Sequence, residues 1–334
     1  MDLAASFAGS FLSQLQSPTL AFLMGGMLLA ATGSKLAIPD AIYRFIVFVL
    51  LMGIGLHGGM EIREANLAAL ALPALLAAIV GCLSVLIGVL TLARLPGIRR
   101  EDALATSGLF GAVSASTLAA AMIVLEEQGM VFEAWAPALY PFMDIPALVL
   151  AIVLAGLHAH KANGHDGQVR VGRIIADSLR GSALSALLLG LLIGLLARPE
   201  RVYEEFYSPL FRGLLSVLLL IMGMEAWTRL AELRRVAHWY MLYAIAAPIT
   251  HGLMGFGFGW IAHEAVGLSP GGVVILAVIA ASNSDISGPP TLRAGIPGAN
   301  PSAYIGASTS LGTPIAIAVG IPLFIALAGL VFGP

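Results

Sequence analysis

The feature that most constrains this chain is a series of ten long apolar runs, separated by short segments that contain polar residues, glycine or proline. A helix needs about 20 mostly apolar residues to cross the hydrocarbon core of a bilayer. Only 11% of the 334 residues are charged and 59% are apolar, which leaves too few polar side chains to cover soluble domains. The sequence therefore predicts an all-α polytopic membrane protein with ten transmembrane helices, near residues 18–34, 40–60, 66–93, 103–125, 134–158, 179–197, 205–227, 236–262, 271–293 and 301–332.

Composition and motifs argue against several other classes of protein. Cys82 is the only cysteine, so a disulfide-linked secreted scaffold is excluded. A net charge of −2 without a basic tail argues against nucleic-acid binding. The sequence contains no phosphate-binding loop and no HExxH or CxxC motif, so we expect a protein that is not an enzyme. The absence of a phosphate-binding loop also means that this chain is not expected to hydrolyse ATP.

Basic residues divide unevenly between the two alternating sets of predicted loops. Thirteen of the 17 fall in one set, namely Lys35, Arg44, Arg94, Arg99, Arg100, Lys161, Arg170, Arg173, Arg180, Arg229, Arg234, Arg235 and Arg293. The other set holds Arg63, Arg198, Arg201 and Arg212 among many glutamates. Because cytoplasmic loops carry an excess of lysine and arginine, we expect the first set to be cytoplasmic and both termini to lie outside. The expected location is the plasma membrane, the inner membrane of a bacterium.

Two short sequence similarities relate the two halves of the chain. LLMGIG at 50–55 is similar to LIMGME at 220–225, and residues 107–121 are similar to 280–294 at nearly the same shift. With five predicted spans on each side of the polar segment 159–178, the halves must cross the membrane in opposite directions. We therefore predict two inverted five-helix repeats, residues 1–158 and 179–334, joined by a cytoplasmic linker at 159–178.

The fourth and ninth predicted spans each contain a polar patch of small residues at membrane depth. Residues 106–117 (TSGLFGAVSAST) contain two glycines and five hydroxyl side chains, and residues 281–291 (ASNSDISGPPT) add an acid and two prolines. Proline lacks an amide N–H and clashes with the preceding turn, so we expect the ninth helix to break before Pro289. Ser287 or Gly288 would cap the helix that resumes there, and Ser114 or Ser116 would cap one in the fourth span.

Broken helices at corresponding positions of two halves are typical of the substrate site of a transporter. A half-helix that starts at mid-membrane presents unpaired N–H groups and a partial positive charge, which suit an anion. Unwound carbonyls and the end of the preceding half-helix suit a small cation. The alternative is close helix packing by small residues such as Ser107 and Gly111, which leaves Asp285 and Pro289 unexplained.

Two acidic residues are predicted at membrane depth. Asp144 lies in the fifth span and Asp285 in the polar patch of the ninth. Because a carboxylate is costly there, Asp285 is interpreted as a cation ligand or proton carrier. Asp144 either binds a cation or is a hydrogen-bonded structural acid. His57 and His251 are interpreted as packing residues rather than as groups of a transport pathway.

With these residues in view, the chain resembles the SbtA-type sodium-dependent bicarbonate permeases over essentially its whole length. The resemblance rests on SGLFGAVSAST at 107–117, SNSDISGPP at 282–290, RAGIPGANPSAY at 293–304, DIP at 144–146 and GIPLF at 320–324. It implies a ten-span fold of inverted repeats, with a core bundle and a gate bundle made from the first, second, sixth and seventh spans, assembled as a homotrimer in the lipid bilayer. It also implies import of bicarbonate with a co-transported sodium ion by alternating access and, in cyanobacterial members, control by a PII-like nucleotide-binding protein.

The resemblance further implies where the ligands would bind in this chain. The anion would lie between the two helix starts, against Ser114, Ala115, Ser116, Thr117, Ser287 and Gly288. The sodium ion would lie beside it, among carbonyls and side chains of Gly108, Phe110, Gly111, Asn283, Ser284 and Asp285, with Asp144 as a further ligand.

The chain departs from the family pattern at two places. Asn283, Asp285 and two prolines stand in its second crossover instead of small residues and an aromatic, and Asp144 stands where glutamate is common. A carboxylate beside an anion is unfavourable unless a cation or proton neutralises it. Symport of another small anion, sodium/proton antiport through Asp285 and Asp144, and a non-transporting membrane scaffold or receptor therefore stay open. Segment 159–178 is also short for a member that a PII-like protein regulates.

Overall fold

The computed structural model describes residues 18–64, 67–163, 180, 182–233, 238–284 and 288–333. Within these ranges every regular element is a helix. Two predicted site residues, Asp285 and Ser287, and most of the segment 159–178 lie outside the described residues. An all-helical fold suits so apolar a chain, because a helix satisfies its backbone hydrogen bonds internally where no water is present.

Seven helical segments of the described chain are long and apolar enough to cross a membrane. They are Asp40–Met60, Ala69–Leu92, Arg100–Glu127, Ala136–His158, Glu200–Thr228, Trp239–Val266 and Pro301–Phe332. Shorter apolar helices, at Ala21–Ala31, Ser185–Leu196 and Pro270–Ala281, fall in the remaining predicted ranges. The prediction of an all-α polytopic membrane protein is thus confirmed at this level.

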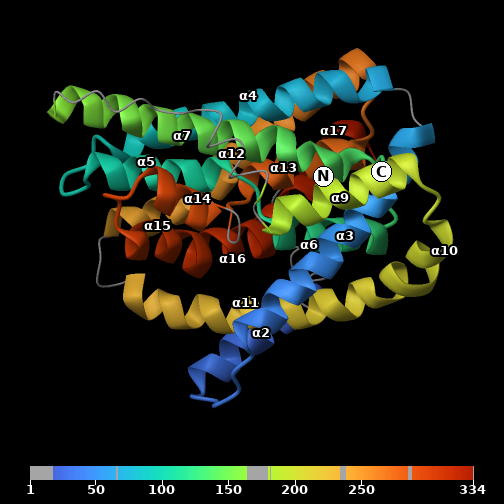
Figure 1. Cartoon of the computed structure of the whole chain (residues 1–334), viewed down its shortest axis with the longest axis horizontal. Helices are drawn as coiled ribbons and strands as arrows, with labels where there is room; N and C mark the ends of the chain where they lie inside the picture. Colours follow the sequence, from blue (N-terminus) through green and yellow to red (C-terminus); the bar gives the residue numbers. More distant parts are fainter. Residues whose placement is uncertain are drawn as a thin grey trace.

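The helices follow one another along the chain as Figure 1 shows. The first half contains α2 (Pro18–Ala31), α3 (Asp40–Glu64), α4 (Leu67–Leu92), α5 (Arg100–Gly111), α6 (Ala115–Glu127), the 3-10 helix η1 (Ala136–Leu139) and α7 (Tyr140–Asn163). The second half begins with α9 (Ser182–Leu196), α10 (Glu200–Val202), the π-helix η2 (Tyr203–Tyr207), α11 (Ser208–Leu233) and α12 (His238–Val266). It ends with α13 (Pro270–Ala281), α14 (Gly288–Gly295), α15 (Pro301–Ala307), the π-helix η3 (Ser308–Gly312), α16 (Thr313–Ile315), the π-helix η4 (Ala316–Gly320) and α17 (Ile321–Phe332).

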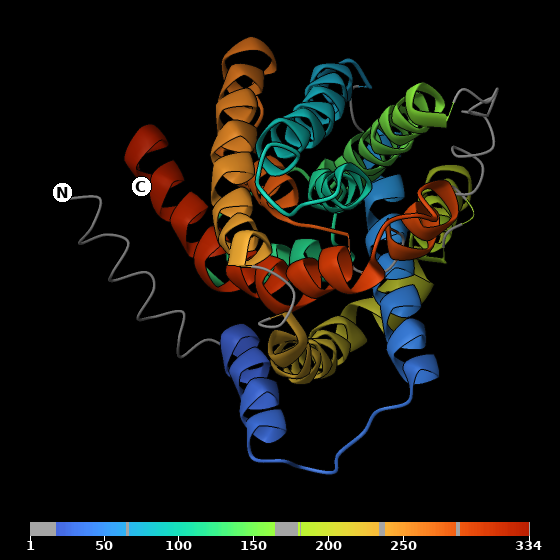
Figure 2. The same ribbon diagram turned by 90° about the vertical axis from the view of Figure 1, so that its left-hand side faces the viewer.

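The helices form two groups that pack against each other. In the first group α3 packs along α9, and α2 along α11. In the second group α4 contacts α5, α7 and α12, while α13 contacts α12, α6 and α17. Figure 2 shows α4, α7 and α12 on one side of the molecule and α2 and α11 on the other. The groups meet where α11 contacts α15, η3 and α6, and where α3 contacts η1 and α6.

Glycines allow α3 and α9 to approach until their backbones touch. A Cβ atom on Gly55 would lie 2.9 Å from the Cα of Gly190, and one on Gly59 would lie 2.9 Å from the Cα of Gly194. Small residues four positions apart on both helices are the pattern by which membrane helices associate closely. α3 and α9 are therefore held together by backbone proximity rather than by interdigitating large side chains.

Substitution of Gly194 by valine is expected to destabilise the folded protein by about 1–3 kcal/mol, because the added side chain must displace the backbone of α3. Thermal unfolding of the purified protein in a neutral detergent measures this effect. Gly257→Val is the matched control, since nothing lies within 4 Å of a Cβ atom at Gly257 in α12. Equal destabilisation by the two variants would show that the α3–α9 contact has no special sensitivity to side-chain size.

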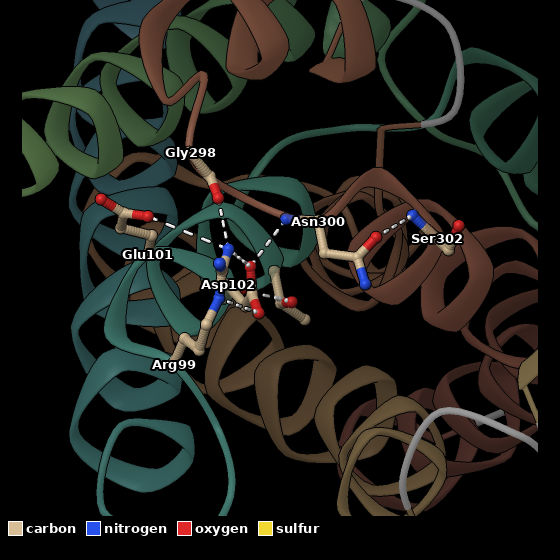
Figure 3. A network of polar contacts seen from close by, with 7 residues as sticks. Arg99, Glu101, Asp102, Gly298, Asn300 and Ser302 are labelled. Atoms are coloured by element: carbon tan, nitrogen blue, oxygen red, sulfur yellow. Dashed lines mark hydrogen bonds and ion pairs between the residues drawn. The ribbon is translucent and has the colours of Figure 1, made fainter.

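A carboxylate joins the start of α5 to the loop before α15, as Figure 3 shows. Asp102 accepts hydrogen bonds from the backbone N–H of Asn300 at 2.7 Å and from the guanidinium of Arg99 at 3.0 Å. Arg99 also donates to the carbonyl of Gly298. Asn300 caps α15, because its side chain accepts from the backbone N–H of Ser302 at 3.1 Å. The two chain segments are thereby fixed to each other.

Glu133 makes a corresponding contact after α6. Its carboxylate accepts from the backbone N–H of Ser269 at 2.7 Å and from the Ser269 hydroxyl at 2.8 Å. The same hydroxyl caps α13 by accepting from the backbone N–H of Gly272 at 3.0 Å. Ser269 lies in GLSPG at 267–271, which fits the GxSxG pattern of serine hydrolases. Since its hydroxyl is engaged by Glu133 and the helix start, this serine is a structural cap.

Candidate functional site

The helix of the fourth predicted span is interrupted, as predicted from its sequence. α5 ends at Gly111 and α6 begins at Ala115. Ser114 caps α6, because its side chain accepts a hydrogen bond from the backbone N–H of Thr117 at 3.2 Å. Ser116, the other cap candidate, lies within the first turn, and its hydroxyl is 2.8 Å from that of Ser114. A helix start of this kind, fully buried in the protein, supplies the N–H groups that suit an anion.

The helix of the ninth predicted span is interrupted as well. α13 ends at Ala281, and α14 begins at Gly288 with Pro289 in its first turn. The prediction that the helix breaks before Pro289 is therefore confirmed. The break has the physical cause given above, since a proline inside a helix removes one backbone donor and clashes with the preceding turn. Asp285 and Ser287 fall in the part of this break that lies outside the described residues.

The two interruptions contact each other. The backbone N–H of Ser284 donates to the carbonyl of Leu109 at 2.9 Å. The backbone N–H of Ser114 donates to the hydroxyl of Ser282 at 2.9 Å, and that hydroxyl donates in turn to the carbonyl of Ile279 at 2.7 Å. Each broken helix thus supplies hydrogen-bond partners to the other. Two polar patches that lie far apart in the sequence form one buried site.

Asp144 supports the first interruption from α7. Its side chain is fully buried, and its Oδ1 accepts a hydrogen bond from the backbone N–H of Val113 at 2.9 Å. Val113 lies between α5 and α6, outside the regular hydrogen-bonding pattern of both helices. Asp144 therefore satisfies a buried backbone donor that would otherwise be costly to leave unpaired.

Asn283 is held by residues of the last predicted span. Its Oδ1 accepts hydrogen bonds from the hydroxyls of Ser308 and Thr313, the latter at 2.8 Å. Its Nδ2 is buried and has no hydrogen-bond partner in the part of the chain that the structure describes. A Cβ atom at Gly312 would lie 2.7 Å from this Nδ2, so the glycine keeps the space beside the amide open. In this orientation the side chain offers N–H donors, which suit the oxygen of an anion.

Two glycines that the family resemblance places near the cation lie where α5 packs closely against α7 and α4. A Cβ atom on Gly108 would lie 2.6 Å from the Cβ of Ala151 in α7. One on Gly111 would lie 2.6 Å from a methyl group of Val85 in α4. Both positions therefore require glycine for packing. Their backbone carbonyls sit at the end of the first half-helix, where a partial negative charge accumulates.

The carbonyl of Phe110 is engaged by a histidine of α12. His251 is buried, and its Nδ1 lies 3.2 Å from the Phe110 carbonyl oxygen. Because a carbonyl only accepts, this contact requires the tautomer with a proton on Nδ1. His251, interpreted from the sequence as a packing residue, is thus also hydrogen-bonded to the backbone at the end of α5. The ring of His57, the other histidine considered, stacks on that of Tyr203 with centroids 5.1 Å apart.

The remaining predicted ligand residues are buried around the two helix starts. Ala115, Ser116 and Thr117 form the first turn of α6, and the Oγ1 of Thr117 has no hydrogen-bond partner among the described residues. The backbone N–H of Gly288 donates to the hydroxyl of Ser284 at 2.8 Å. Thr117 thus offers an unused hydroxyl, whereas the first N–H of α14 is already occupied.

Three polar residues of the site were not predicted. They are Ser282, which links the two interruptions, and Ser308 and Thr313, which hold Asn283. The signal for the last two was present as STSLGT at 308–313, a run of hydroxyl residues inside an otherwise apolar span. The structure places this run in the π-helix η3, whose geometry departs from the regular α-helix, and at the first residue of α16.

A cavity of about 550 Å³ lies between the two helix groups and reaches the second interruption. Asp40 and Glu225 line it from the first group, and Pro289 and Thr309 line it from the second. Pro289 belongs to the first turn of α14, and Thr309 follows the serine that binds Asn283. The cavity therefore borders residues that adjoin the buried site in the chain.

Comparison with known proteins gives one match to a family. A sequence model of the Na⁺-dependent bicarbonate transporter superfamily matches residues 18–329. The match includes both interrupted helices, Asp144 and the hydroxyl run at 308–313. No curated protein matches the chain.

Proposed function

Because the chain belongs to the Na⁺-dependent bicarbonate transporter superfamily, we propose that it is a secondary transporter that imports bicarbonate with sodium ions by alternating access. The observation that carries this proposal is the buried contact between two broken helices. Ser284 donates to the carbonyl of Leu109, and Ser114 donates to the hydroxyl of Ser282. Paired helix breaks of this kind suit an anion and a cation together. We propose a role in transport and no enzymatic activity.

We propose that ten helices span the membrane as two inverted five-helix repeats, residues 1–158 and 179–334, joined by the linker 159–178. The helix contacts support this symmetry. α2 packs on α11 of the other half, and α9 packs on α3 in the same way. Likewise, Asp102 of α5 binds the residue that caps α15, and Glu133 before α7 binds the residue that caps α13. Each contact from the first half to the second is thus matched by an equivalent contact from the second half to the first.

In this proposal α2, α3, α9 and α11 form the gate bundle, and the other long helices form the core bundle. The cavity of about 550 Å³ between them lies beside Asp40 and Glu225, at the helix ends expected to face the cytoplasm. A smaller cavity of about 310 Å³ lies between α2, α6 and α11, beside Glu127 and Arg212. Movement of the core past the gate would open one cavity as it closes the other.

We propose that bicarbonate binds between the two helix starts. Its partners would be Ser114, Ala115, Ser116 and Thr117 at the first and Ser287 and Gly288 at the second, where the N–H of Gly288 would have to leave the hydroxyl of Ser284 to bind the anion. Two unused donors support this placement, namely the Oγ1 of Thr117 and the Nδ2 of Asn283. Carbonate oxygens accept hydrogen bonds, so both donors fit an anion.

We propose that sodium binds beside the anion, at the carbonyl end of α5. Its ligands would come from Gly108, Phe110, Gly111, Asn283, Ser284, Asp285 and Asp144. For Asn283 the backbone carbonyl is the suitable group, since its side-chain oxygen already accepts two hydroxyls. A carboxylate would offset the charge of the cation, which explains why an acid is tolerated near an anion.

The resemblance to this family also suggests a location and an assembly, which we propose here. We propose a multi-pass protein of the bacterial inner membrane with both termini outside. The ion pairs Arg63–Glu200 and Arg212–Glu126 join segments that this topology assigns to one and the same side of the membrane. A homotrimer and a cytoplasmic PII-like regulator stay predictions of the family resemblance.

Uptake of labelled bicarbonate into proteoliposomes is expected to depend on an inward sodium gradient. A tenfold gradient supplies about 1.4 kcal/mol, so electroneutral cotransport of one sodium ion with each bicarbonate gives about tenfold accumulation. The measurement compares uptake with sodium gradients of either direction and with choline in place of sodium. Sodium-independent uptake, or none, would contradict the proposal. Proton flux without any anion would instead indicate sodium/proton antiport, and sodium-driven uptake of a different anion would correct the substrate.

A further inference from the structure

A smaller cavity lies outside the proposed transport site, at the corner where α4 and α7 end and α5 begins. Its volume is about 250 Å³. Four apolar side chains and two basic ones line it, namely Val89, Leu104, Leu154, Leu157, Arg100 and His158. No carboxylate is among these lining residues. The cavity thus combines an apolar wall with donors of hydrogen bonds to an anion.

The positive charge of Arg100 is not compensated by the acidic residues beside it. Arg100 is exposed and forms no ion pair or hydrogen bond in the described part of the chain. Asp102 is instead bound to Arg99 and to the backbone of Asn300, and Glu101 lies 3.9 Å from Arg99 (Figure 3). The acids of this turn therefore engage the loop before α15, and the guanidinium of Arg100 stays available to a ligand.

The cavity lies at the surface that a bilayer would cover. Leu157 in its wall is 53% exposed, and Leu90, next to Val89 on α4, is 52% exposed. Side chains of this kind on a membrane helix contact lipid tails. Arg100 is the first residue of α5 and His158 lies in the last two turns of α7, near the helix ends where lipid headgroups are found.

We propose that this corner binds the phosphate of an anionic phospholipid, with an acyl chain against the apolar wall. Arginine binds phosphate through two parallel N–H donors, and the His158 ring supplies a further donor from α7. Basic pockets between membrane helices are known to hold anionic headgroups. A zwitterionic lipid fits less well, because its ammonium group meets no carboxylate among the lining residues.

Lipid titration of the purified full chain in a neutral detergent tests this proposal. Phosphatidylglycerol is expected to bind and to raise the unfolding temperature, whereas phosphatidylcholine has a much smaller effect. Arg100→Gln is expected to weaken phosphatidylglycerol binding at least about fivefold, which corresponds to the ~1 kcal/mol typical of one basic residue near a lipid surface. His158→Gln is expected to weaken it less. Native mass spectrometry counts the bound lipids directly.

Arg94→Gln is the matched control, because Arg94 is exposed in the same α4–α5 connection but does not line the cavity. It is expected to bind phosphatidylglycerol as the unmodified chain does. Equal losses in the two arginine variants would show diffuse charge attraction and overturn the site. Full binding by Arg100→Gln, or equal stabilisation by millimolar inorganic phosphate, would also overturn it. The assay requires no transport, so its outcome is independent of the proposed sodium coupling.

Discussion

Replacing Asp144 with asparagine is expected to raise the half-saturating sodium concentration for bicarbonate uptake at least about tenfold, while the protein stays folded. The asparagine carbonyl can still accept the hydrogen bond from the backbone N–H of Val113. The negative charge is lost, and two opposite unit charges about 4 Å apart attract each other by about 4 kcal/mol at an effective dielectric constant of about 20, so a tenfold effect is the lower limit. Sodium dependence of uptake in proteoliposomes, with thermal stability measured in parallel, checks this expectation.

Asp144→Leu separates the two roles of this side chain. Leucine removes both the charge and the acceptor, and an unpaired buried N–H costs about 1–3 kcal/mol. This variant is expected to lose uptake and to unfold at a lower temperature. Glu264→Gln, which removes a charge from an exposed position on α12, is expected to change neither property. If Asp144→Asn keeps the normal sodium dependence, Asp144 is only a structural acid that holds the crossover.

The positions of the helix breaks were predictable because their causes are local. Pro289 cannot continue the ladder of hydrogen bonds in a preceding helix, and Ser114 has the side chain that caps a new one. Both signals lie within a few residues of the break itself. They show where backbone groups become available, which is why the sequence located the candidate site at all.

The partners of those backbone groups were not predictable by the same means. The backbone N–H of Ser284 binds the carbonyl of Leu109, which lies in the other half of the chain. The side chain of Asn283 binds the hydroxyls of Ser308 and Thr313, which lie 25 and 30 residues further along the sequence. No periodicity in the sequence encodes which faces of these helices meet. Asp144 shows the same limit, since its residue type predicted a buried acid but not the N–H of Val113 as its partner.

Helix lengths also differ from what apolar runs indicate. The predicted run 271–293 is long enough to cross a bilayer, yet α13 stops at Ala281 because the polar break ends it. The length of an apolar run shows how many side chains are favourable in lipid. The length of a helix depends instead on where its backbone hydrogen bonding stops. The ten apolar runs therefore predicted which segments are hydrophobic enough to span a membrane. They did not predict how the helices pack, such as the close glycine contacts between α3 and α9.

Asn283→Asp is expected to raise the KM for bicarbonate at least about 100-fold without raising the half-saturating sodium concentration. Aspartate can accept the hydroxyls of Ser308 and Thr313 as asparagine does, so the local structure is preserved. It has no N–H to donate to the anion and places a negative charge beside it, and such like-charge contacts cost several kcal/mol. Initial rates of uptake at varied bicarbonate and saturating sodium measure the effect.

Asn300→Asp is the control with the same chemical change, because aspartate caps a helix as well as asparagine does and Asn300 serves as the cap of α15. Its KM for bicarbonate is expected to be unchanged. If the amide of Asn283 were rotated by 180°, its Nδ2 would donate to the two hydroxyls and its Oδ1 would face the cation, so the opposite result is expected. A carboxylate would then bind sodium at least as well and leave the KM for bicarbonate unchanged. The KM for bicarbonate and the half-saturating sodium concentration of Asn283→Asp therefore decide whether this side chain binds the anion or the cation. Asn283→Leu cannot decide this, because leucine also removes the acceptor of the Ser308 and Thr313 hydroxyls.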